Sequence, residues 1–543
     1  MRIQGFAFRR INRRRGFFIS RRISGTRAPP VFRRGNGGFT RYTPGICGKI
    51  ISVKITSLFI LTLCLCPSAR ALENKRADII YKISIPDPAR GLINVEVLFN
   101  EVPPGGLVLS ELGSSGYLNL SGLKAKYGSG VPLEIRSYGE GKPGFKKKEH
   151  LIKNAAVGMK VEYAVRPGAV GRHGHIGYLD GRFGLIEGKN LFLFPRDAAG
   201  FNGITVEFKL PEGWEAVCPW KKTGGVFAIE RDYYGYGLDT RTVLDKAVIG
   251  FGNFRSCEKE IDGFKARIYA FSGWSPERSA SICERAFKLT EYQVKLFGFN
   301  KRWDYTVIFV PEAADKERRV FGGSYSLGQG YEMEKLTSRR WELFSHRLHH
   351  VFNAYPPLGM SMDTWFAEAG ASYYEIKALS SLGYYKLEDR LFRLYGSYKS
   401  GRAGNDAPLS SEPEPNSKKE NFLHYTKAPL VAYLLDEKIK KNTKGEKDLD
   451  LFLRHIYSER AMRKGALNLR EELEKFTGAG FGDFFEKYVD GAEKIKLKFG
   501  LKRHFASNGK TYLILLLCLI ALSEIFSALR ARGKAKNSSN LVK

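Results

Sequence analysis

Cysteine is scarce in this chain, and few of its cysteines lie where a folded body is expected. The sequence has seven cysteines in 543 residues; three precede residue 72 and one lies in an apolar run near the C-terminus. The other three are Cys218, Cys257 and Cys283. So few thiols exclude a small scaffold held by many disulfides, and they leave one disulfide and one remaining thiol for the body.

Acidic residues are absent from both ends of the chain. Residues 1–71 contain 15 Lys or Arg and residues 530–543 contain five more, without a single Asp or Glu. The formal net charge is +32, but the stretch in between has 68 basic and 56 acidic residues and is much closer to neutral. Because the positive excess belongs to the ends, we expect no nucleic-acid partner for the body.

Long hydrophobic runs are also few, and the first lies near the N-terminus. Ile51–Ala71 combines one Lys, an apolar run and Pro67, followed by small residues at positions 69 and 71. This layout is typical of a cleavable secretory signal, so we expect residues 1–71 to be a basic leader and signal peptide, cut after Ala71. An uncleaved N-terminal anchor is the alternative.

The second hydrophobic run lies near the C-terminus. Thr511–Leu529 is a 19-residue, predominantly apolar run, and at 1.5 Å per residue a helix of this length crosses about 30 Å of hydrocarbon. We therefore predict a transmembrane helix at 511–529, between a basic juxtamembrane segment (499–510) and a basic cytoplasmic tail (530–543). With the signal, this predicts a single-pass membrane protein whose main body lies on the extracytoplasmic side.

The remaining sequence predicts an α+β multidomain protein. Residues 72–260 run in short alternating segments broken by Gly and Pro, which favours an N-terminal β-sandwich domain. In residues 261–399 the hydrophobic pattern changes to a helical spacing. We expect a long amphipathic helix capped by Ser275, then a strand and two further helices, which indicates an α/β domain. A polar loop or linker at 400–421 leads to a helical domain at 422–498.

The residues with the clearest chemistry lie in the α/β domain. His346 and His350 are four residues apart on a predicted helix, about 40° apart around its axis, so both imidazoles can face one ion. Glu368 follows 18 residues later, on the next predicted helix. Two histidines at this spacing and a later carboxylate are the ligand set of zinc metallopeptidases with an H-E-x-x-H helix. Here Arg347 occupies the position of the Glu in that motif.

At these residues the chain resembles the glycyl aminopeptidase family of zinc metallopeptidases, gluzincins related to aminopeptidase N and thermolysin. Trp365 to Glu375 is similar to the family's W-F-S-E-G-F-T-S-Y-Y-E run. His350 to Asn353 resembles its H-x-W-N segment, and Tyr425 to Lys427 its Y-x-K-G segment. Residues 476–493 are similar to its C-terminal helical signature. The resemblance covers roughly residues 76–495 and implies a thermolysin-like domain at 261–399.

The resemblance also implies roles for individual residues. Zn²⁺ would be held by His346, His350 and Glu368, and Tyr425 would assist the transition state. The family's G-G-L-E-H segment aligns with residues 322–326, which implies that the substrate is bound by Gly322, Gly323 and Tyr325.

Two departures from the family bear on activity. The family's Glu beside the first His is the general base, whereas the guanidinium of Arg347 stays protonated and only donates hydrogen bonds. Tyr325 replaces the carboxylate that binds the substrate's amine, and we expect the family's C-terminal PDZ domain to be absent. We therefore predict a degenerate member, a hydrolytically inactive or impaired pseudoenzyme that binds a peptide or an envelope protein partner. Because the charge of Arg347 would repel Zn²⁺, we expect zinc binding to be weak or lost.

Two alternatives remain open from the sequence. The first is an active zinc aminopeptidase that uses a different general base, for which Glu342 and His349 are the candidates. The second is a purely structural role, in which the two histidines of the helix pack or hydrogen-bond between helices and hold no metal. The arrangement of the side chains around Arg347 would distinguish them.

Overall fold

The computed structural model describes residues 77–498, apart from several gaps, and residues 517–527. The gaps are 104–105, 112–118, 141–146, 168–176, 197–200, 202, 231–238, 312–328, 333–337, 354–363, 412, 415–416 and 461–467. Several predictions lie outside the described residues: the leader and signal peptide (1–71), the juxtamembrane segment (499–510), the tail (530–543), and the substrate-binding residues Gly322, Gly323 and Tyr325.

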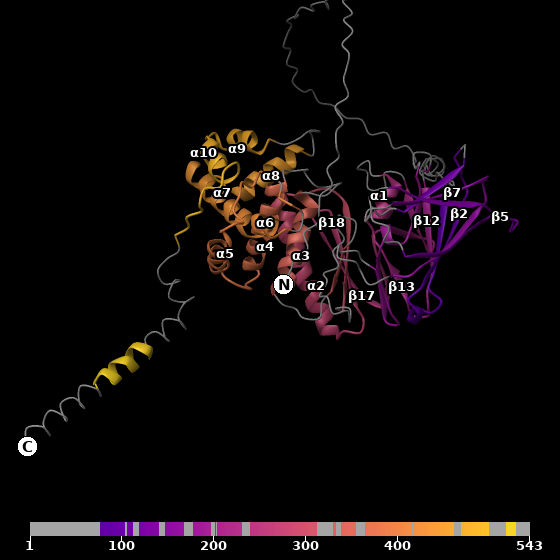
Figure 1. Cartoon of the computed structure of the whole chain (residues 1–543), viewed down its shortest axis with the longest axis horizontal. Coiled ribbons are helices and arrows are strands. Elements are labelled where there is room, and N and C mark those ends of the chain that lie inside the picture. The colour runs from indigo at the N-terminus through magenta and orange to yellow at the C-terminus, as the bar shows by residue number, and fades with distance from the viewer. Residues whose placement is uncertain are drawn as a thin grey trace, which may run out of the picture. The chain divides into compact units, whose positions relative to one another are not determined.

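Strands dominate the described chain up to Gly252 (Figure 1). An eight-stranded sheet has the order β14 (Lys221–Thr223), β15 (Val226–Glu230), β12 (Gly203–Lys209), β1 (Ile79–Ser84), β2 (Ile93–Phe99), β8 (Lys160–Val165), β4 (Leu120–Lys126), β5 (Pro132–Leu133). One four-stranded sheet has the order β13 (Glu215–Val217), β16 (Val248–Gly252), β10 (Phe183–Glu187), β9 (Gly177–Leu179). Another has the order β11 (Leu193–Pro195), β3 (Leu107–Glu111), β7 (Lys147–Ile152), β6 (Ile135–Glu140).

The alternating sequence pattern explains these strands. Along β2, buried residues alternate with half-buried ones, because successive side chains point to opposite faces of a sheet. Tyr81 is fully buried and donates its hydroxyl hydrogen to the carbonyl of Leu193 at 2.7 Å. The predicted β-rich N-terminal region is confirmed, whereas its finer description as a sandwich stays a prediction.

A further four-stranded sheet follows, in the order β17 (Phe254–Ile261), β18 (Phe264–Phe271), β19 (Trp303–Val310), β20 (Gln329–Glu332). Strand β18 pairs antiparallel with β17 and parallel with β19. Because β17 belongs to this sheet, the sheet begins earlier in the chain than the domain start that we expected at residue 261.

The long helix α2 (Pro276–Phe297) connects β18 to β19 and has the predicted cap. The hydroxyl of Ser275 accepts a hydrogen bond from the backbone N–H of Arg278 at 3.2 Å, as an N-cap residue does. At the other end, Gly298 has φ 61°, the left-handed conformation in which glycine terminates helices.

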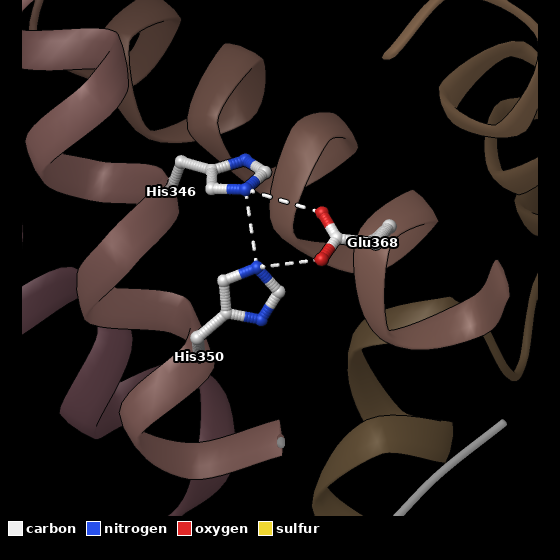
Figure 2. A group of neighbouring side chains, drawn as sticks. All are labelled: His346, His350 and Glu368. Carbon is white, nitrogen blue, oxygen red and sulfur yellow. Dashed lines mark hydrogen bonds and ion pairs between the residues drawn. The ribbon is translucent and has the colours of Figure 1, made fainter. Parts of the chain in front are cut away.

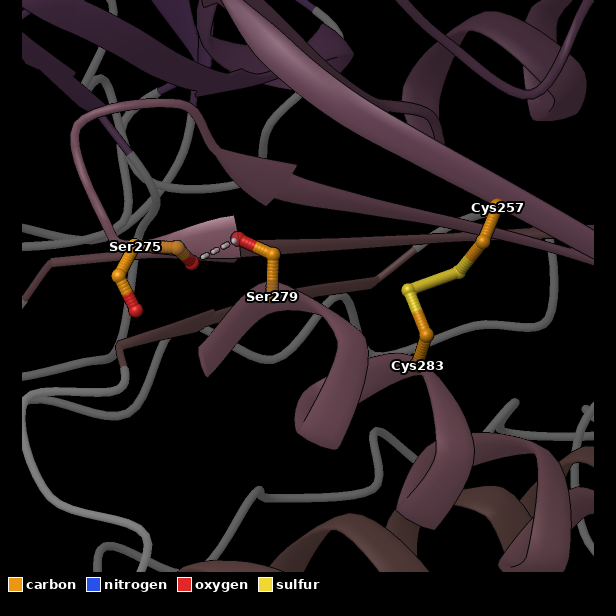
Figure 3. The surroundings of a disulfide bond; sticks show 4 residues. All are labelled: Cys257, Ser275, Ser279 and Cys283. Carbon is orange, nitrogen blue, oxygen red and sulfur yellow. Dashed lines mark hydrogen bonds between the residues drawn. A yellow bond between two sulfur atoms is a disulfide. The ribbon is translucent and has the colours of Figure 1, made fainter. Parts of the chain in front are cut away.

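One disulfide joins this helix to the sheet (Figure 3). It links Cys257 of β17 to Cys283 of α2. Cys218 is buried and free. The expectation of one disulfide and one remaining thiol in the body is therefore confirmed.

Helices make up most of the described chain beyond the sheet (Figure 1). They are α3 (Ser338–Asn353), α4 (Thr364–Ser381), α5 (Leu387–Gly401), α6 (Lys418–Phe422), the π-helical turn η4 (Leu423–Lys427), α7 (Ala428–Asn442), α8 (Leu449–Arg460), α9 (Leu469–Thr477) and α10 (Gly482–Tyr488). Three short helices lie earlier in the chain: η1 (Pro88–Arg90), η2 (Gly188–Asn190) and α1 (Thr240–Asp245).

The predicted helical region is confirmed, but the expected linker at 400–421 is partly packed. Ala407 and Leu409 are buried in the main hydrophobic core, and α6 begins at Lys418. Most residues of this stretch are polar, so the sequence did not predict that Ala407 and Leu409 would pack into the core.

The predicted transmembrane helix lies mostly outside the described residues. Of residues 511–529, only 517–527 are described, and they are helical. Within the described part of the chain, no helix combines the length and apolar character needed to cross a membrane.

Candidate metal centre

The candidate centre is built on α3, whose sequence places apolar and polar side chains on a buried surface. Trp341, Phe344 and Leu348 recur at helical spacing and are fully buried. This packing carries His346 and His350 inward as well, with relative exposures of 5% and 2%. Buried imidazoles need partners, because each ring nitrogen must donate or accept a hydrogen bond.

Helix α4 supplies the third member of the centre. Between Thr364 and Tyr374 its only charged residue is Glu368, in a helix segment that is otherwise almost entirely buried. Figure 2 shows the Glu368 carboxylate facing the two imidazoles of α3. An ionised carboxylate in such surroundings is costly unless positive or hydrogen-bonding groups meet it.

The three side chains converge as ligands of one ion. The Nε2 atoms of His346 and His350 are 3.1 Å apart. Glu368 Oε2 lies 3.4 Å from His346 Nε2, and Glu368 Oε1 lies 3.5 Å from His350 Nε2. In a tetrahedron with ligand bonds of about 2.0 to 2.1 Å, as for zinc, neighbouring ligand atoms are about 3.3 to 3.4 Å apart. Each Nε2 lies near that spacing from the other and from one of the two Glu368 oxygens, and one ligand atom from each residue can be chosen so that all three lie within 4.8 Å of one another.

The donor chemistry also fits a cation. The two Nε2 atoms face each other, and at most one hydrogen fits between them. Oε2 of Glu368 is buried and, among the described residues, makes no well-aligned hydrogen bond. A small divalent ion would accept lone pairs from all these atoms at once, so the residues present fit zinc.

The far nitrogens of both rings are held by acceptors. Nδ1 of His346 lies 3.1 Å from Glu375 Oε2, and Nδ1 of His350 lies 3.1 Å from Asn353 Oδ1. The amide of Asn353 is oriented by a bond from its Nδ2 to the carbonyl of Ala367 at 2.8 Å. Acceptors at Nδ1 favour the tautomer with its hydrogen on that nitrogen, and this leaves Nε2 as the atom of each ring that can bind a metal ion.

A close approach of α3 and α4 makes this geometry attainable. Gly370 of α4 lies against α3, and a Cβ at this position would come within 3.1 Å of His349 Nε2 and 3.5 Å of Asn353 Nδ2. The bond from Asn353 to Ala367 crosses the same helix pair. Small residues and one hydrogen bond thus set the distance between the two histidines and the carboxylate.

Electrostatics keep the carboxylate ionised. Burial alone would raise the pKa of Glu368, but the imidazoles of His350 and His346 hold it well below its usual range. Burial, with smaller effects of His346 and Arg347, lowers the pKa of His350 against the opposing effect of Glu368. Burial also acts to lower the pKa of His346, but its contacts with Glu368 and Glu375 raise it above the ordinary value.

Arg347 lies between the two histidines in the sequence and beside His350 on the helix. Its side chain is half-buried, and residues three apart on a helix are neighbours. Its positive charge is the smallest of several influences on the pKa of His350, which it acts to lower. Arg347 is not one of the clustered ligands, and in the described chain only His346, His350 and Glu368 form a metal-binding group of three or more.

Glu342, one of the two candidate alternative bases, is engaged elsewhere. Its Oε1 accepts from Arg390 Nε at 3.1 Å, and its Oε2 accepts from Arg339 Nη1 at 3.1 Å. Burial would raise the pKa of Glu342, but these guanidiniums hold it below the usual value. A carboxylate with both oxygens bound to arginines is a weak base.

His349, the other candidate, is a packed core residue. It is fully buried, its Nδ1 lies 2.9 Å from Gln293 Oε1, and its ring stacks on Tyr374 at 5.2 Å. Burial lowers the pKa of His349 well below its ordinary value. His349 therefore packs and hydrogen-bonds between helices. The structural alternative for His346 and His350 stays a prediction.

Tyr425 is brought to the centre by the π-helical turn η4. Its ring centroid lies 5.9 Å from that of His346. Irregular π turns often occur at functional sites, where they change the direction of one side chain. The turn is fixed by buried Lys427, whose Nζ donates to the Ala407 carbonyl at 2.5 Å and lies 3.0 Å from Asp406 Oδ1.

Comparison with solved structures assigns the architecture. An aminopeptidase N family protein from Idiomarina loihiensis matches with a TM-score of 0.59 and 16% identity, over 77% of this chain and 77% of that one. The fold is that of the aminopeptidase N family. Two further structures are more distant: an M1 zinc metallopeptidase from Deinococcus radiodurans (TM-score 0.48, 13% identity, 78% of this chain and 95% of that one) and native yeast LTA4 hydrolase (TM-score 0.46, 11% identity, 79% and 70%). No protein-family model and no curated protein matches the sequence.

The aminopeptidase N fold accounts for the α+β organisation that the sequence predicts. The structure brings together the three predicted ligands and Tyr425, and places Arg347 beside them. The contacts of Asn353 with the His350 ring and of Glu375 with the His346 ring were not predicted from the sequence. A weak signal existed for Asn353, because a residue three positions after His350 on a helix lies next to it.

Proposed function

We propose that this chain is a metallopeptidase-like protein related to the glycyl aminopeptidases, which holds Zn²⁺ at His346, His350 and Glu368 and binds peptides with little or no hydrolysis. The observation that carries the proposal is the convergence of two buried Nε2 atoms, 3.1 Å apart, on the Glu368 carboxylate, one of whose oxygens lies 3.4 Å from His346 and the other 3.5 Å from His350, with both far ring nitrogens bound to acceptors. When bound there, zinc would supply Lewis-acid polarisation of a peptide carbonyl.

As a catalyst, the centre would need a general base, and each candidate among the described residues is unsuited to that role. Hydrolysis requires a group that takes a proton from water and passes it to the leaving amine. Arg347 only donates, Glu342 is bound to Arg339 and Arg390, and His349 is stacked in the core. Glu375 is committed to His346 Nδ1. Tyr425 can donate a hydrogen bond to a developing oxyanion, but it does not replace the base.

The test of a metal centre is direct zinc binding to the full chain in detergent. We expect one zinc ion per chain in the wild type, and loss of that ion in His346→Ala but not in the control His455→Ala, which changes a histidine of α8. Equal zinc content in the wild type and His346→Ala would refute the site.

The test of impaired hydrolysis uses the zinc-loaded chain and aminoacyl reporters. We expect no turnover above that of the His346→Ala variant. Turnover that a chelator and His346→Ala both abolish would instead establish the alternative, an active zinc aminopeptidase that uses a different general base.

Replacing the cation should separate metal binding from catalysis. In Arg347→Glu we expect tighter zinc binding by calorimetry, because a carboxylate beside His350 attracts the ion that a guanidinium repels. Unchanged affinity would contradict the idea that Arg347 acts on the metal. Recovery of turnover would show that the base was the only missing part.

We further propose that the body is exported and anchored by residues 511–529. The support comes from the sequence, namely the signal-like segment at 51–71 and the apolar run itself. Deletion of 511–529 should release the protein from the membrane fraction. A deletion variant that stays in that fraction would mean that the N-terminal segment is the anchor.

A further inference from the structure

Basic residues without acidic neighbours gather where the described body ends. From residue 494 to residue 510 the sequence has six Lys or Arg and neither Asp nor Glu. The first three lysines of this stretch are described, and they are exposed at alternate positions: Lys494, Lys496 and Lys498. Between them, Ile495 is fully buried and Leu497 packs against the same core. The apolar residues fix the segment to the body, so its lysines face the solvent.

Helix α5 holds this segment in place and adds a fourth lysine. The hydroxyl of Tyr398 accepts a hydrogen bond from the Ile495 backbone N–H at 3.1 Å, and the hydroxyl of Tyr395 donates to the Ile495 carbonyl at 3.3 Å. The rings of the two tyrosines stack, with centroids 6.2 Å apart. Nζ of Lys399, an exposed residue, lies 5.0 Å from the centroid of the Tyr395 ring. The two tyrosines therefore bring Lys399 to the same part of the surface as the lysines that flank Ile495.

These four lysines form what we call the basic face: Lys399, Lys494, Lys496 and Lys498. In the part of the chain that the structure describes, none of the four is ion-paired with a carboxylate. Arg402, just after α5, differs, because it pairs with Asp406 at 2.7 Å. Glu493 is the nearest acid in the sequence. Burial and then the charge of Glu493 raise the pKa of Tyr488, so this carboxylate lies toward α10. The four positive charges are open to an anionic partner.

The position of the basic face along the chain points to a lipid surface as that partner. Residues 499–510 separate it from the apolar run at 511–529, and these 12 residues span at most about 40 Å when fully extended. If that run is anchored in a bilayer, as proposed above, the basic face stays close to the lipid headgroups. Each lysine near an anionic bilayer surface strengthens binding about fivefold. A soluble acidic partner would not be held at this distance.

We infer that the basic face docks on a bilayer surface that carries anionic headgroups, with α5 and residues 494–498 turned toward the membrane. The inference rests on the proposed anchoring by residues 511–529. It goes further, because an anchor alone leaves the body free to rotate on its tether, whereas a charged face fixes which side of the body meets the lipid. The phosphate of a lipid headgroup is the ligand, and free phosphate in solution is the other source of the same chemistry.

The test measures how fast each lysine is acetylated on the full chain in lipid nanodiscs. Discs of phosphatidylcholine are compared with discs that also contain phosphatidylglycerol. Acetic anhydride, an uncharged reagent, modifies the lysines, and mass spectrometry gives the rate at each position. We expect the basic face to react about threefold more slowly or less in the anionic discs. The difference should vanish in 1 M salt, where the Debye length is about 3 Å.

Lys209 is the matched control for this experiment. It is an exposed lysine of β12 that forms no ion pair with any described residue, and its rate should be the same in both kinds of disc. Equal rates at the basic face in both kinds of disc overturn the inference, as does equal slowing of Lys209. Slowing by inorganic phosphate in phosphatidylcholine discs would assign the effect to free phosphate, and it also overturns the inference.

A variant assigns the effect to the segment that follows α10. In a chain with Lys494→Gln, Lys496→Gln and Lys498→Gln, the slowing of Lys399 in anionic discs should disappear, because three of the four charges are gone. In Lys209→Gln it should remain. Lys399 that is still slowed in the triple variant overturns the role of residues 494–498.

The failure of this inference is distinguishable from the failure of the proposed anchor. Recovery of the chain with phosphatidylcholine discs, with and without residues 511–529, is measured first. A chain that stays in the discs but shows equal acetylation rates refutes only the inference. A chain that is not recovered with the discs refutes the anchor. The basic face is then decided by the same acetylation assay after anionic or phosphatidylcholine vesicles are added to the chain.

Discussion

Asn353→Leu is the substitution that tests most directly how the chain holds its metal ligands. Leucine has nearly the size of asparagine but neither of its polar atoms. It removes the acceptor 3.1 Å from His350 Nδ1 and the donor 2.8 Å from the Ala367 carbonyl. The buried N–H of His350 is then left without a partner, at a cost of about 1 to 3 kcal/mol, and the lost Ala367 bond adds about 1 kcal/mol. We expect the free energy of unfolding to fall by roughly 2 to 4 kcal/mol.

The effect on metal binding should be as large. Loss of the group that orients a ligating histidine typically lowers metal affinity about tenfold to a hundredfold, and competition with a chromophoric chelator would measure this for zinc. Asn353→Asp is the informative partner, because it keeps an oxygen for His350 while it loses the donor to Ala367. We expect it to be destabilised but to retain wild-type zinc affinity or exceed it. The reasoning is refuted if both variants lose stability and both bind zinc as the wild type does.

Three further predictions concern stability. Burial raises the pKa of Glu111 to about 7 against the influence of Lys148. Between about pH 4.5 and 7 the folded state therefore binds more protons than the unfolded state. The free energy of unfolding should fall as the pH rises through this window, by up to about 1.4 kcal/mol per pH unit. Glu111→Gln should remove that slope in chemical unfolding at pH 5 and pH 8, and an unchanged slope would contradict it. The Cys257–Cys283 disulfide closes a loop over a sequence separation of 26 residues, so its reduction should lower the unfolding free energy by about 3 to 4 kcal/mol if chain entropy dominates; an unshifted denaturation midpoint would argue otherwise. Asp436 is 1% exposed and accepts from Tyr373, Lys440 and the Leu449 N–H; Asp436→Ala should cost about 3 to 5 kcal/mol in the same assay, and a loss below about 1 kcal/mol would mean that these helices are held by apolar packing alone.

The sequence predicted those parts of the site that depend on local spacing. His346 and His350 face one point because four residues make about one helical turn, and Glu368 stands out as the only charge in its part of α4. The cap of α2 at Ser275 was equally local. Such features follow from the periodicity of one helix and need no knowledge of its neighbours.

The sequence did not predict features that depend on how distant segments pack. Glu342 looked available on its own helix, but Arg390 binds it from 48 residues away. Glu375 of α4 lies 3.1 Å from His346 Nδ1 of α3, a contact that exists only once the two helices are packed together. These contacts are set by the packing of α3 against α4 and α5, which no single-helix pattern contains.

Because Gly370 has no side chain, α4 can lie close to α3, and the geometry of the centre depends on that close spacing. The histidines belong to one helix and the carboxylate to the other, so a separation of a few tenths of an ångström more would open two of the three ligand contacts at once. A single methyl group at Gly370 would press on His349 and Asn353. Coordination could therefore be lost by a change that leaves every ligand, every charge and most of the core as they are.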